Sequence, residues 1–400
     1  MFPRKCQYAY NKKNKFSVKS PFFEKLLTNH PFYDIINREN ASDHAETRKK
    51  MRANENDIIK INELYEGRVP FYGELHDHGA TGGTSDGKRP LSHWIGALEA
   101  LKMDFAAILD HRQVRHMYLP EWEDGLFIGG SEPGTRITDS KAEDNSIHYN
   151  MVFEGPKPLE ELLSEFPEYE FECGSEGHFK YPRFTTERFC ELIDAVKAKG
   201  GFFVHPHPKQ QMQSSDPLDY WFRDETGIEV FYKDMANKHT ENNYKLWTDL
   251  LSAGKRLWAC AGGDLHKCAT DAAMTTIYAE EKKNASYISH LREGDFICGP
   301  VGIKMCIGDT KMGGKCDFDG QRLVLAIGDF HKSVKFECHR YRMDILDDCG
   351  VVYSKEIGCS EPSYFAFDVS DRKFYRAEVF DLTRNLRIAI GNPIWNKKYF

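Results

Sequence analysis

Short, β-prone apolar runs alternate with amphipathic stretches over residues 69–299. Helical periodicity marks the stretches 91–102, 186–199 and 242–253. Strand–helix alternation of this kind predicts a parallel sheet whose strands are joined by crossover helices. Seven such runs fit a closed or nearly closed β/α barrel better than an open, doubly wound sheet. The runs are VPFYGELHDH, FAAILDH, GLFIGGSEPGT, IHYNMVFEG, GGFFVHPHP, GIEVFY and RLWACAGGDLH.

The pattern changes on both sides of this region. Residues 300–400 show alternating apolar and polar positions with turn residues between the runs, which predicts a small antiparallel β-sandwich. Residues 1–68 are polar and rich in charge, and we expect them to form an N-terminal helical extension. The sequence therefore predicts an α/β protein with three parts, which are residues 1–68, 69–299 and 300–400.

Composition and charge narrow the class of protein. A chain of 400 residues with 40% apolar residues is long enough for a barrel and a second module. The formal net charge of −7 argues against a general nucleic-acid binder, which needs a basic surface. The 11 cysteines form no CxxC pair and are expected to be reduced thiols. Because no signal-type or membrane-spanning apolar stretch is seen, we expect a cytoplasmic protein that does not cross a membrane.

Three pairs of metal-competent side chains stand two residues apart, each at the end of an apolar run. On a strand, residues i and i+2 project from the same face, so each pair can converge on one point. Imidazole and carboxylate groups are common ligands of zinc, manganese and iron. The pairs are His76 with His78, His205 with His207, and Asp264 with His266.

The remaining predicted strand ends also carry ligand-capable groups. A single such residue at a strand end is usually a turn former, a cap or a satisfied core group, but coincidence at all seven ends is hard to defend. Catalytic residues of α/β barrels lie on the loops that follow the strands. The sequence therefore predicts an active site built around a metal cluster. The further residues are Asp86, Asp110, His111, Glu132, His148 and Glu229.

In order and spacing these motifs resemble the PHP (polymerase and histidinol phosphatase) superfamily over about residues 69–300. The resemblance implies a PHP-type distorted (β/α)7 barrel and a metal-dependent phosphoesterase. The segment Gly391-Asn392-Pro393-Ile394-Trp395 resembles the tail of the carbaryl-hydrolase-type (CehA/McbA-like) branch. One departure is the loop between His78 and Asp86, which is longer than usual in the family. The matching motifs are His76-x-His78, Ser85-Asp86-Gly87, Asp110-His111, Gly130-x-Glu132, His148, His205-Pro206 and Gly263-Asp264-x-His266.

The resemblance also implies a ligand set for two or three divalent ions, with Glu132 as the bridge between them. His207 is expected to contact the substrate or donate a proton. Asp110 is expected to orient a ligand imidazole or to cap a loop. The implied metal ligands are His76, His78, Asp86, His111, Glu132, His148, His205, Asp264 and His266.

This ligand set favours an anionic small-molecule substrate such as a phosphate ester. Six neutral imidazoles and three carboxylates do not neutralise three divalent ions, so positive charge is left for a substrate to balance. Histidine-rich ligation favours zinc, manganese or iron over magnesium. A hydroxide bridging the ions is the expected nucleophile, because coordination lowers the pKa of water toward about 7. The candidate phosphate-clamping residues are Lys88, Arg89, Arg112 and Lys209.

Two alternatives remain open from the sequence. The same metal site could cleave a carbamate, an ester or an amide, as the C-terminal resemblance suggests. The domain could instead hold metal without catalysis, as a scaffold or sensor. The sequence leaves open the natural substrate, the metal, the role of residues 301–400 and whether the chain forms oligomers.

Overall fold

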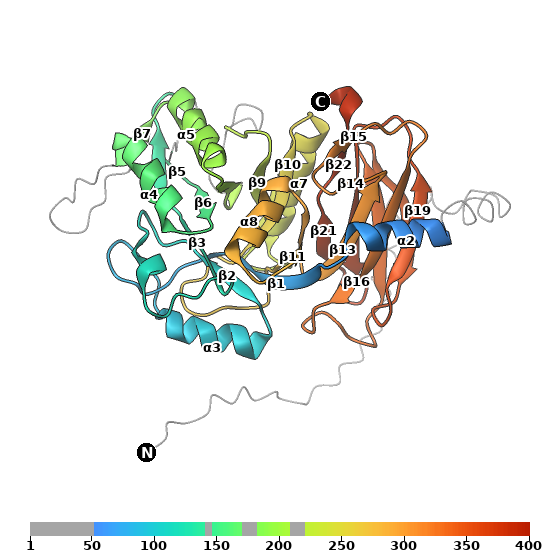
Figure 1. Cartoon of the computed structure of the whole chain (residues 1–400), viewed down its shortest axis with the longest axis horizontal. Helices are drawn as coiled ribbons and strands as arrows, with labels where there is room; N and C mark the ends of the chain where they lie inside the picture. Colours follow the sequence, from blue (N-terminus) through green and yellow to red (C-terminus); the bar gives the residue numbers. More distant parts are fainter. Residues whose placement is uncertain (1–51, 141–145, 170–181, 209–220) are drawn as a thin grey trace, which may run out of the picture. The chain divides into compact units, whose positions relative to one another are not determined.

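The computed structural model describes residues 52–140, 146–169, 182–208 and 221–400 of the chain (Figure 1). The predicted N-terminal extension is described only from residue 52 onward. It contains helix α2 (Glu55–Leu64), which begins at a capping box formed by Asn54 and Asp57. Asp57 also pairs with Arg322 at 2.6 Å, which holds the helix against strand β16 (Arg322–Phe330). Lys209 and the first 51 residues lie outside the described part.

The chain is a mixed α/β protein, and all seven predicted apolar runs form strands. These strands are hydrogen-bonded in the order β10-β9-β8-β6-β3-β2-β1. Apart from residues 69–72 at the start of the first strand, their residues are buried, as expected for strands covered on both faces. Their bounds are β1 (Val69–Asp77), β2 (Phe105–Ile108), β3 (Phe127–Ser131), β6 (Asn150–Phe153), β8 (Phe202–His205), β9 (Thr226–Tyr232) and β10 (Leu257–Gly262).

The two ends of this row of strands meet just beyond β10. The backbone N–H of His78 donates to the carbonyl of Leu265 at 2.8 Å, and the N–H of Asp264 donates to the carbonyl of His76 at 2.7 Å. Asp77 and Leu265 form a parallel bridge. The residues that follow the last strand therefore lie directly against the end of the first one.

Strand β6 departs from the parallel sheet that the alternating pattern predicts. It runs antiparallel to both β3 and β8, whereas β1, β2 and β3 pair in parallel, as do β8, β9 and β10. Between β3 and β6 the chain passes through two short strands instead of a crossover helix, so it enters β6 from the opposite end. These strands, β4 (Gly134–Ile137) and β5 (Ser146–His148), form a three-stranded sheet with β7 (Arg183–Phe184).

Helices pack against the row of strands and close its core. Three of them confirm predicted helical stretches, namely α3 (Leu91–Leu101), α5 (Thr186–Ala198) and α7 (Lys238–Ser252). Each turns apolar side chains inward, such as Trp94 of α3, Phe189 of α5 and Trp247 of α7, all fully buried. Two further helices are labelled in Figure 1: α4 (Pro156–Glu165) contacts α5, and α8 (Asn284–Glu293) contacts β3, β6 and β8.

The strands of residues 300–400 pair antiparallel, as the alternating pattern predicts, except that residues 315–316 and 394–396 pair in parallel. One sheet contains β16 with β13 (Val301–Ile307), β14 (Thr310–Lys311) and β19 (Ser363–Asp368). The others extend the large sheet through β11 (Thr275–Ala279) and β12 (Phe296–Cys298), because β12 pairs with β21. The predicted boundary at residue 299 is therefore crossed by a continuous sheet. The extending strands are β21 (Leu386–Gly391), β20 (Phe374–Asp381), β17 (Tyr341–Asp347) and β18 (Gly350–Ile357), and the short strands β15 (Lys315–Cys316) and β22 (Ile394–Asn396) pair beside them.

A buried ionic cluster fastens α7 to these C-terminal strands. Arg387 lies 3.4 Å above the ring of Tyr244, and Tyr244 donates a hydrogen bond to Glu378 at 2.6 Å. Glu378 also binds Arg387 at 2.9 Å and pairs with Arg376, whose side chain is buried.

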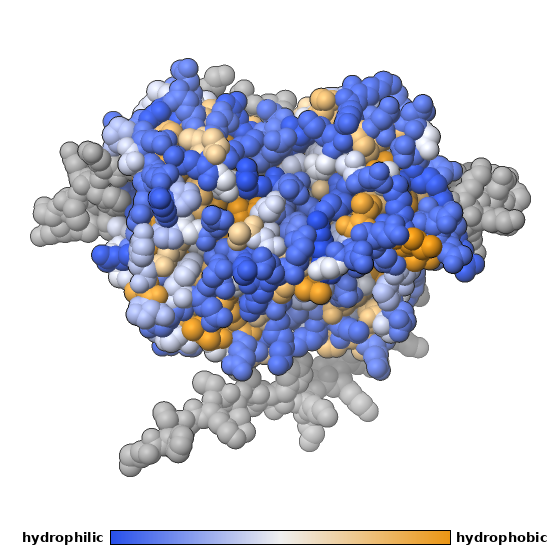
Figure 2. Space-filling model, in the orientation of Figure 1, coloured by the Kyte–Doolittle hydropathy of each residue, from blue (hydrophilic) through white to orange (hydrophobic). Residues whose placement is uncertain are grey.

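The outer face shown in Figure 2 is mostly hydrophilic, with scattered apolar patches. Within the described residues, no helix has both the length and the apolar character that crossing a membrane requires.

Candidate metal centre

Ligand-capable side chains from distant parts of the chain meet at the carboxyl ends of these strands. They form three overlapping groups, in each of which one nitrogen or oxygen atom per residue lies within 4.8 Å of the others. Two of the groups share Glu132, and two share His78. The groups are His76, His78, Glu132 and Asp264; Glu132, His148 and His207; and His78, Asp86, His111 and His266.

Glu132, which follows β3, lies at the centre of the groups and is 1% exposed. One carboxylate oxygen lies 3.0 Å from His148 Nδ1, and the other lies 3.3 Å from His76 Nε2 and 3.2 Å from His78 Nε2. Burial would raise the pKa of Glu132, but the surrounding imidazoles, led by His76, hold it well below its usual value. A buried carboxylate kept ionised among imidazoles suits a ligand shared between cations.

The two histidines of β1 project into the same group because they are two residues apart on one strand. His76 Nε2 and both ring nitrogens of His78 are buried and make no hydrogen bond within the described part of the chain. Buried imidazole nitrogens normally find a partner. A lone pair that faces a cation would satisfy His76 Nε2 and one ring nitrogen of His78, so the residues fit a bound metal ion.

Asp264 faces the same two histidines from the loop after β10. Its Oδ1 lies 3.5 Å from His78 Nε2, and its Oδ2 accepts a hydrogen bond from Tyr232 at 2.9 Å. Burial alone would lower the pKa of His78, but contacts with Asp264 and Glu132 raise it to about 9. Burial alone would raise the pKa of Asp264, but it is lowered, mainly through His78 and His76. The imidazole of His78 therefore holds a proton that a metal ion would displace, while the carboxylates that face it are ionised.

The structure brings Asp86 to the third group despite the long loop that precedes it. Its Oδ1 lies 3.0 Å from His266 Nε2 and 3.5 Å from His111 Nε2. The side chain is 49% exposed, so this group forms the open side of the site. His111 is also held from behind, since its Nδ1 lies 2.8 Å from the backbone carbonyl of Glu132.

Asp110 serves the loop that carries Asp86 and lies in none of the three groups. Its carboxylate accepts a hydrogen bond from the backbone N–H of Gly79 at 2.8 Å and another from the hydroxyl of Thr81. Of its two expected roles, orienting a ligand or capping a loop, the structure places it in the second. Its effect on the site passes through the loop and not through contact with the grouped ligands.

The second histidine pair does not behave as a strand pair. Strand β8 ends at His205, and His207 has a backbone φ of 29°, so side-chain alternation does not continue to it. The centroid of the His205 ring lies 5.0 Å from that of Phe203 and 4.8 Å from that of Phe222. Burial lowers the pKa of His205 to about 3. His207 instead places Nε2 3.4 Å from Glu132. Among the described residues, His207 and not His205 therefore belongs to a group of ligand-capable side chains, and the expectation that the two share a face is wrong.

Glu229 on β9 supports two of the grouped histidines at once. Its carboxylate lies 3.0 Å from His76 Nδ1 and accepts a hydrogen bond from the backbone N–H of His207 at 2.7 Å. A carboxylate behind a histidine fixes the ring and raises its basicity toward a metal.

Two buried acids of β1, Glu74 and Asp77, were missed by the sequence analysis although both lie within two residues of His76. Burial raises the pKa of both, to about 8 for Asp77.

Strained backbone is concentrated at this site. Four of the eight non-glycine residues with positive φ in the described chain are Arg112, His207, Lys233 and Asp264. Such conformations cost about 1–3 kcal/mol and cluster at functional sites. Lys233, which the sequence analysis missed, places Nζ 3.4 Å from Asp264 Oδ2 and is 47% exposed. Lys233 directly follows Tyr232, the last residue of β9. Its place just after a strand end is the sequence signal that could have identified it.

The residues predicted to clamp a phosphate lie at different places in the structure. Arg112 follows His111 and donates from Nη2 to the carbonyl of Gly134 at 3.2 Å. Lys88 and Arg89 fix the loop that carries Asp86 through backbone hydrogen bonds. The N–H of Lys88 donates to the carbonyl of His266 at 2.6 Å, and the carbonyl of Arg89 accepts from the N–H of Ala80 at 2.7 Å. Lys209 lies outside the described residues.

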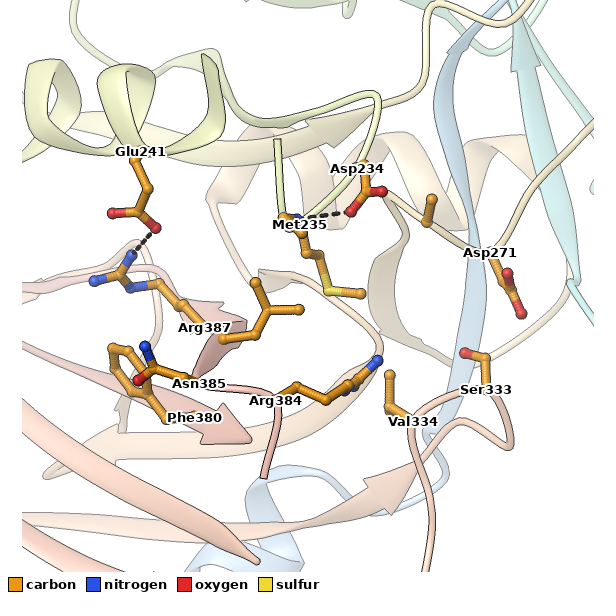
Figure 3. Close-up of a pocket in the computed structure, with 13 residues that line it drawn as sticks. Asp234, Met235, Glu241, Asp271, Ser333, Val334, Phe380, Arg384, Asn385 and Arg387 are labelled. Carbon is orange, nitrogen blue, oxygen red and sulfur yellow. Dashed lines mark hydrogen bonds and ion pairs between the residues drawn. The ribbon is translucent and has the colours of Figure 1, made fainter. Parts of the chain in front are cut away.

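A separate cavity of about 770 Å³ lies between the loops after β9 and β10 and the C-terminal strands (Figure 3). Figure 3 shows Arg384 extending toward Val334 and Arg387 paired with Glu241 at 3.1 Å. Arg384 is paired as well, at 2.6 Å from Asp381. The lining contains none of the grouped ligands. The cavity is therefore separate from the three groups of ligand-capable side chains.

No protein-family model matches the chain, and no curated protein matches it in sequence. A candidate metal-dependent phosphoesterase of known structure from Bifidobacterium adolescentis is 15% identical over 48% of this chain and 87% of its own, with a TM-score of 0.31. An amidohydrolase from Chromobacterium violaceum, with bound sulfate and no metal, is 14% identical over 49% and 87%, with a TM-score of 0.31. The lesion-specific endonuclease Q from Pyrococcus furiosus is 12% identical over 56% of each chain, with a TM-score of 0.37. Similarity at this level does not establish a family for the chain.

Proposed function

We propose that this protein is a metal-dependent hydrolase that cleaves a small phosphate ester. The observation that carries the proposal is the sharing of Glu132 and His78 between groups whose atoms lie within 4.8 Å of one another. Shared ligands suit ions about 3.5–4 Å apart, the separation found in paired catalytic metal sites. When bound, such ions supply a strongly polarising charge and a water molecule that is deprotonated near neutral pH.

Nine residues would hold two or three divalent ions in this proposal. Imidazole and carboxylate donors favour zinc, manganese or iron. The set keeps the composition implied by the sequence, with His207 in the place of His205. We also propose that the row of seven strands is a PHP-type distorted (β/α)7 barrel followed by a C-terminal β-sandwich. The proposed ligands are His76, His78, Asp86, His111, Glu132, His148, His207, Asp264 and His266.

Other residues would position this set and receive the substrate. Glu229 fixes the ring of His76 and the backbone of His207, and Asp110 fixes the loop that carries Asp86. Lys233 and Arg112 present positive charge at the rim, held there by backbone of positive φ. Lys233 is placed to contact an oxygen of an anionic group that approaches Asp264.

Charge supports a phosphate over a neutral ester. Three carboxylates among the proposed ligands leave about three positive charges unbalanced beside three divalent ions, and Lys233 adds to them. A phosphate monoester carries up to two negative charges near neutral pH. With only two ions the surplus is smaller, and a carbamate, ester or amide then becomes the competing substrate.

The proposal is tested by measuring metal content and substrate preference together. Elemental analysis of protein purified without added metal should find zinc, manganese or iron. The loaded protein should hydrolyse p-nitrophenyl phosphate in preference to a phosphodiester or a carboxyl ester. Glu132→Gln should lose both metal and activity, whereas Glu281→Gln, in an exposed pair with Lys283, should lose neither. Turnover of carboxyl esters alone would exclude the phosphatase.

A further inference from the structure

Two arginines stand side by side on the small sheet next to the metal centre. Arg136 of β4 and Arg183 of β7 are register partners on parallel strands, so both side chains leave the same face of the sheet. Both residues are exposed. Within the described residues, no carboxylate lies within 4 Å of either guanidinium, and neither side chain makes a hydrogen bond. Like charges placed directly opposite each other destabilise a sheet, so this pair has no evident structural role.

The same register links these arginines to a proposed metal ligand. His148 of β5 is the partner of Gly134, two residues before Arg136 on β4. Because residues two apart on a strand share a face, His148, Arg136 and Arg183 all lie on one face of this sheet. The opposite face carries Ile137 and Phe184, which are buried. The face that is not packed into the core therefore carries the histidine and both arginines.

This face begins at the metal centre. His148 Nδ1 lies 3.0 Å from Glu132, and Arg112 donates to the carbonyl of Gly134 at 3.2 Å. Two residues of extended strand span about 7 Å, and neighbouring strands lie about 4.8 Å apart. The guanidinium groups of Arg136 and Arg183 are thus roughly one small-molecule length from the metal ligands.

We propose that Arg136 and Arg183 form a second anion subsite, which binds a phosphate or carboxylate carried by the substrate at its far end from the scissile phosphate. The inference rests on the proposed function, because the metal centre takes the first anionic group. Planar guanidinium groups match the oxygens of phosphate and carboxylate and bind them strongly. Because no carboxylate of the described residues neutralises the pair, it can receive such a group, and the metal centre already supplies enough charge for the scissile phosphate.

A series of alkane bisphosphonates of increasing chain length measures the subsite in the metal-loaded protein. Calorimetry should show that one length binds about tenfold more tightly than the matching monophosphonate, the gain expected from one charge-assisted contact. Arg136→Gln and Arg183→Gln should each remove this gain and leave monophosphonate binding unchanged. Arg136→Lys should retain part of it. Arg340→Gln, at an exposed arginine directly before β17, is the control and should keep the full gain.

The possible failures are distinguishable. If the monophosphonate does not bind the loaded protein, the proposed function fails. If it binds but no chain length improves on it, or if the gain survives in both glutamine variants, the second subsite is wrong. Inorganic phosphate titrated into the metal-free protein gives an independent result by NMR. The side-chain signals of Arg136 and Arg183 should shift well before that of Arg340, and equal shifts would overturn the inference.

Discussion

His207 and Glu132 are 75 positions apart in the chain, yet the imidazole Nε2 of His207 lies 3.4 Å from the Glu132 carboxylate. The contact depends on the positive φ of His207, which turns its ring away from the direction that strand β8 gives to His205. His205 packs among phenylalanines instead. The two histidines of one short motif therefore take different roles, and this difference can be measured.

We expect His207→Asn to weaken metal binding and His205→Leu to leave it unchanged. Loss of a direct ligand should reduce metal affinity by more than the roughly 10–100-fold that loss of a supporting contact costs. His205 is neutral and buried in apolar surroundings, so leucine replaces it without removing a charge. Metal titrations of the two variants check the prediction. Equal loss of affinity in both would mean that His205 also binds metal.

Glu229→Gln should lower metal affinity about 10–100-fold while the protein stays folded. The carboxylate accepts hydrogen bonds from both His76 and the backbone of His207, and a glutamine offers only one accepting oxygen. Competition with a metal chelator gives the affinity, and circular dichroism reports folding. Glu225→Gln, in a surface pair with Arg256 and Lys197, is the control and should match wild type. Unchanged affinity in Glu229→Gln would remove its supporting role.

Metal removal should lower the melting temperature of the wild-type protein. An ion that binds only the folded state adds about 2.7 kcal/mol at a concentration of 100 times its Kd. Thermal melts with chelator and with added zinc or manganese measure this gain. Glu132→Gln should show little response to metal, because Glu132 belongs to two of the ligand groups. A variant that gains as much as wild type would show that the ions bind elsewhere.

Lys233→Met should lower kcat/KM for a phosphate ester about tenfold with metal content unchanged. Its ammonium group lies 3.4 Å from Asp264 at the rim, where an anionic substrate would meet it. A contact with a charged group contributes about 1.5–3 kcal/mol, which corresponds to tenfold or more in rate. Lys238→Met, at the start of α7, is the matched control. A fall in metal content instead of kcat/KM would mean that Lys233 acts only through Asp264.

Glu378→Gln should destabilise the protein by about 3–5 kcal/mol near neutral pH, because it leaves the buried Arg376 without its partner. Burial would raise the pKa of Glu378, but Arg376 and Arg387 outweigh burial and lower it to about 2. Its folded pKa lies below its unfolded value, so the stability it adds is present above about pH 4.5 and is lost as pH falls toward 2.

The difference between wild type and Glu378→Gln should therefore shrink in acid, as measured by urea unfolding from pH 7 to pH 3. Glu356→Gln removes a pair with Arg340 whose side chains are 58% and 68% exposed. Exposed pairs contribute about 0–1 kcal/mol, so this control should change little at any pH. A Glu378→Gln defect that stays constant down to pH 3 would contradict the lowered pKa.

The seven strands and most of the grouped residues could be predicted from the sequence because the information is local. A buried strand needs an apolar run, and a ligand pair on one face needs a spacing of two, as at His76 and His78. The ligand-capable side chain that follows each apolar run can be identified from the sequence without coordinates. The sequence by itself therefore determined the mixed α/β class, the location of the candidate site at the strand ends, and the types of ligand-capable donor present.

Only the tertiary structure decided which of these groups meet. Alternation stops where a strand ends, so the turn at His207 could not be read from the spacing of two. The reversed direction of β6 depends on how the chain returns through β4 and β5, and the Arg136–Arg183 pair depends on a register between segments far apart in sequence. Glu229 and Lys233 acquire their partners in the same way. These features depend on contacts between distant residues, and such contacts exist only once the chain has folded.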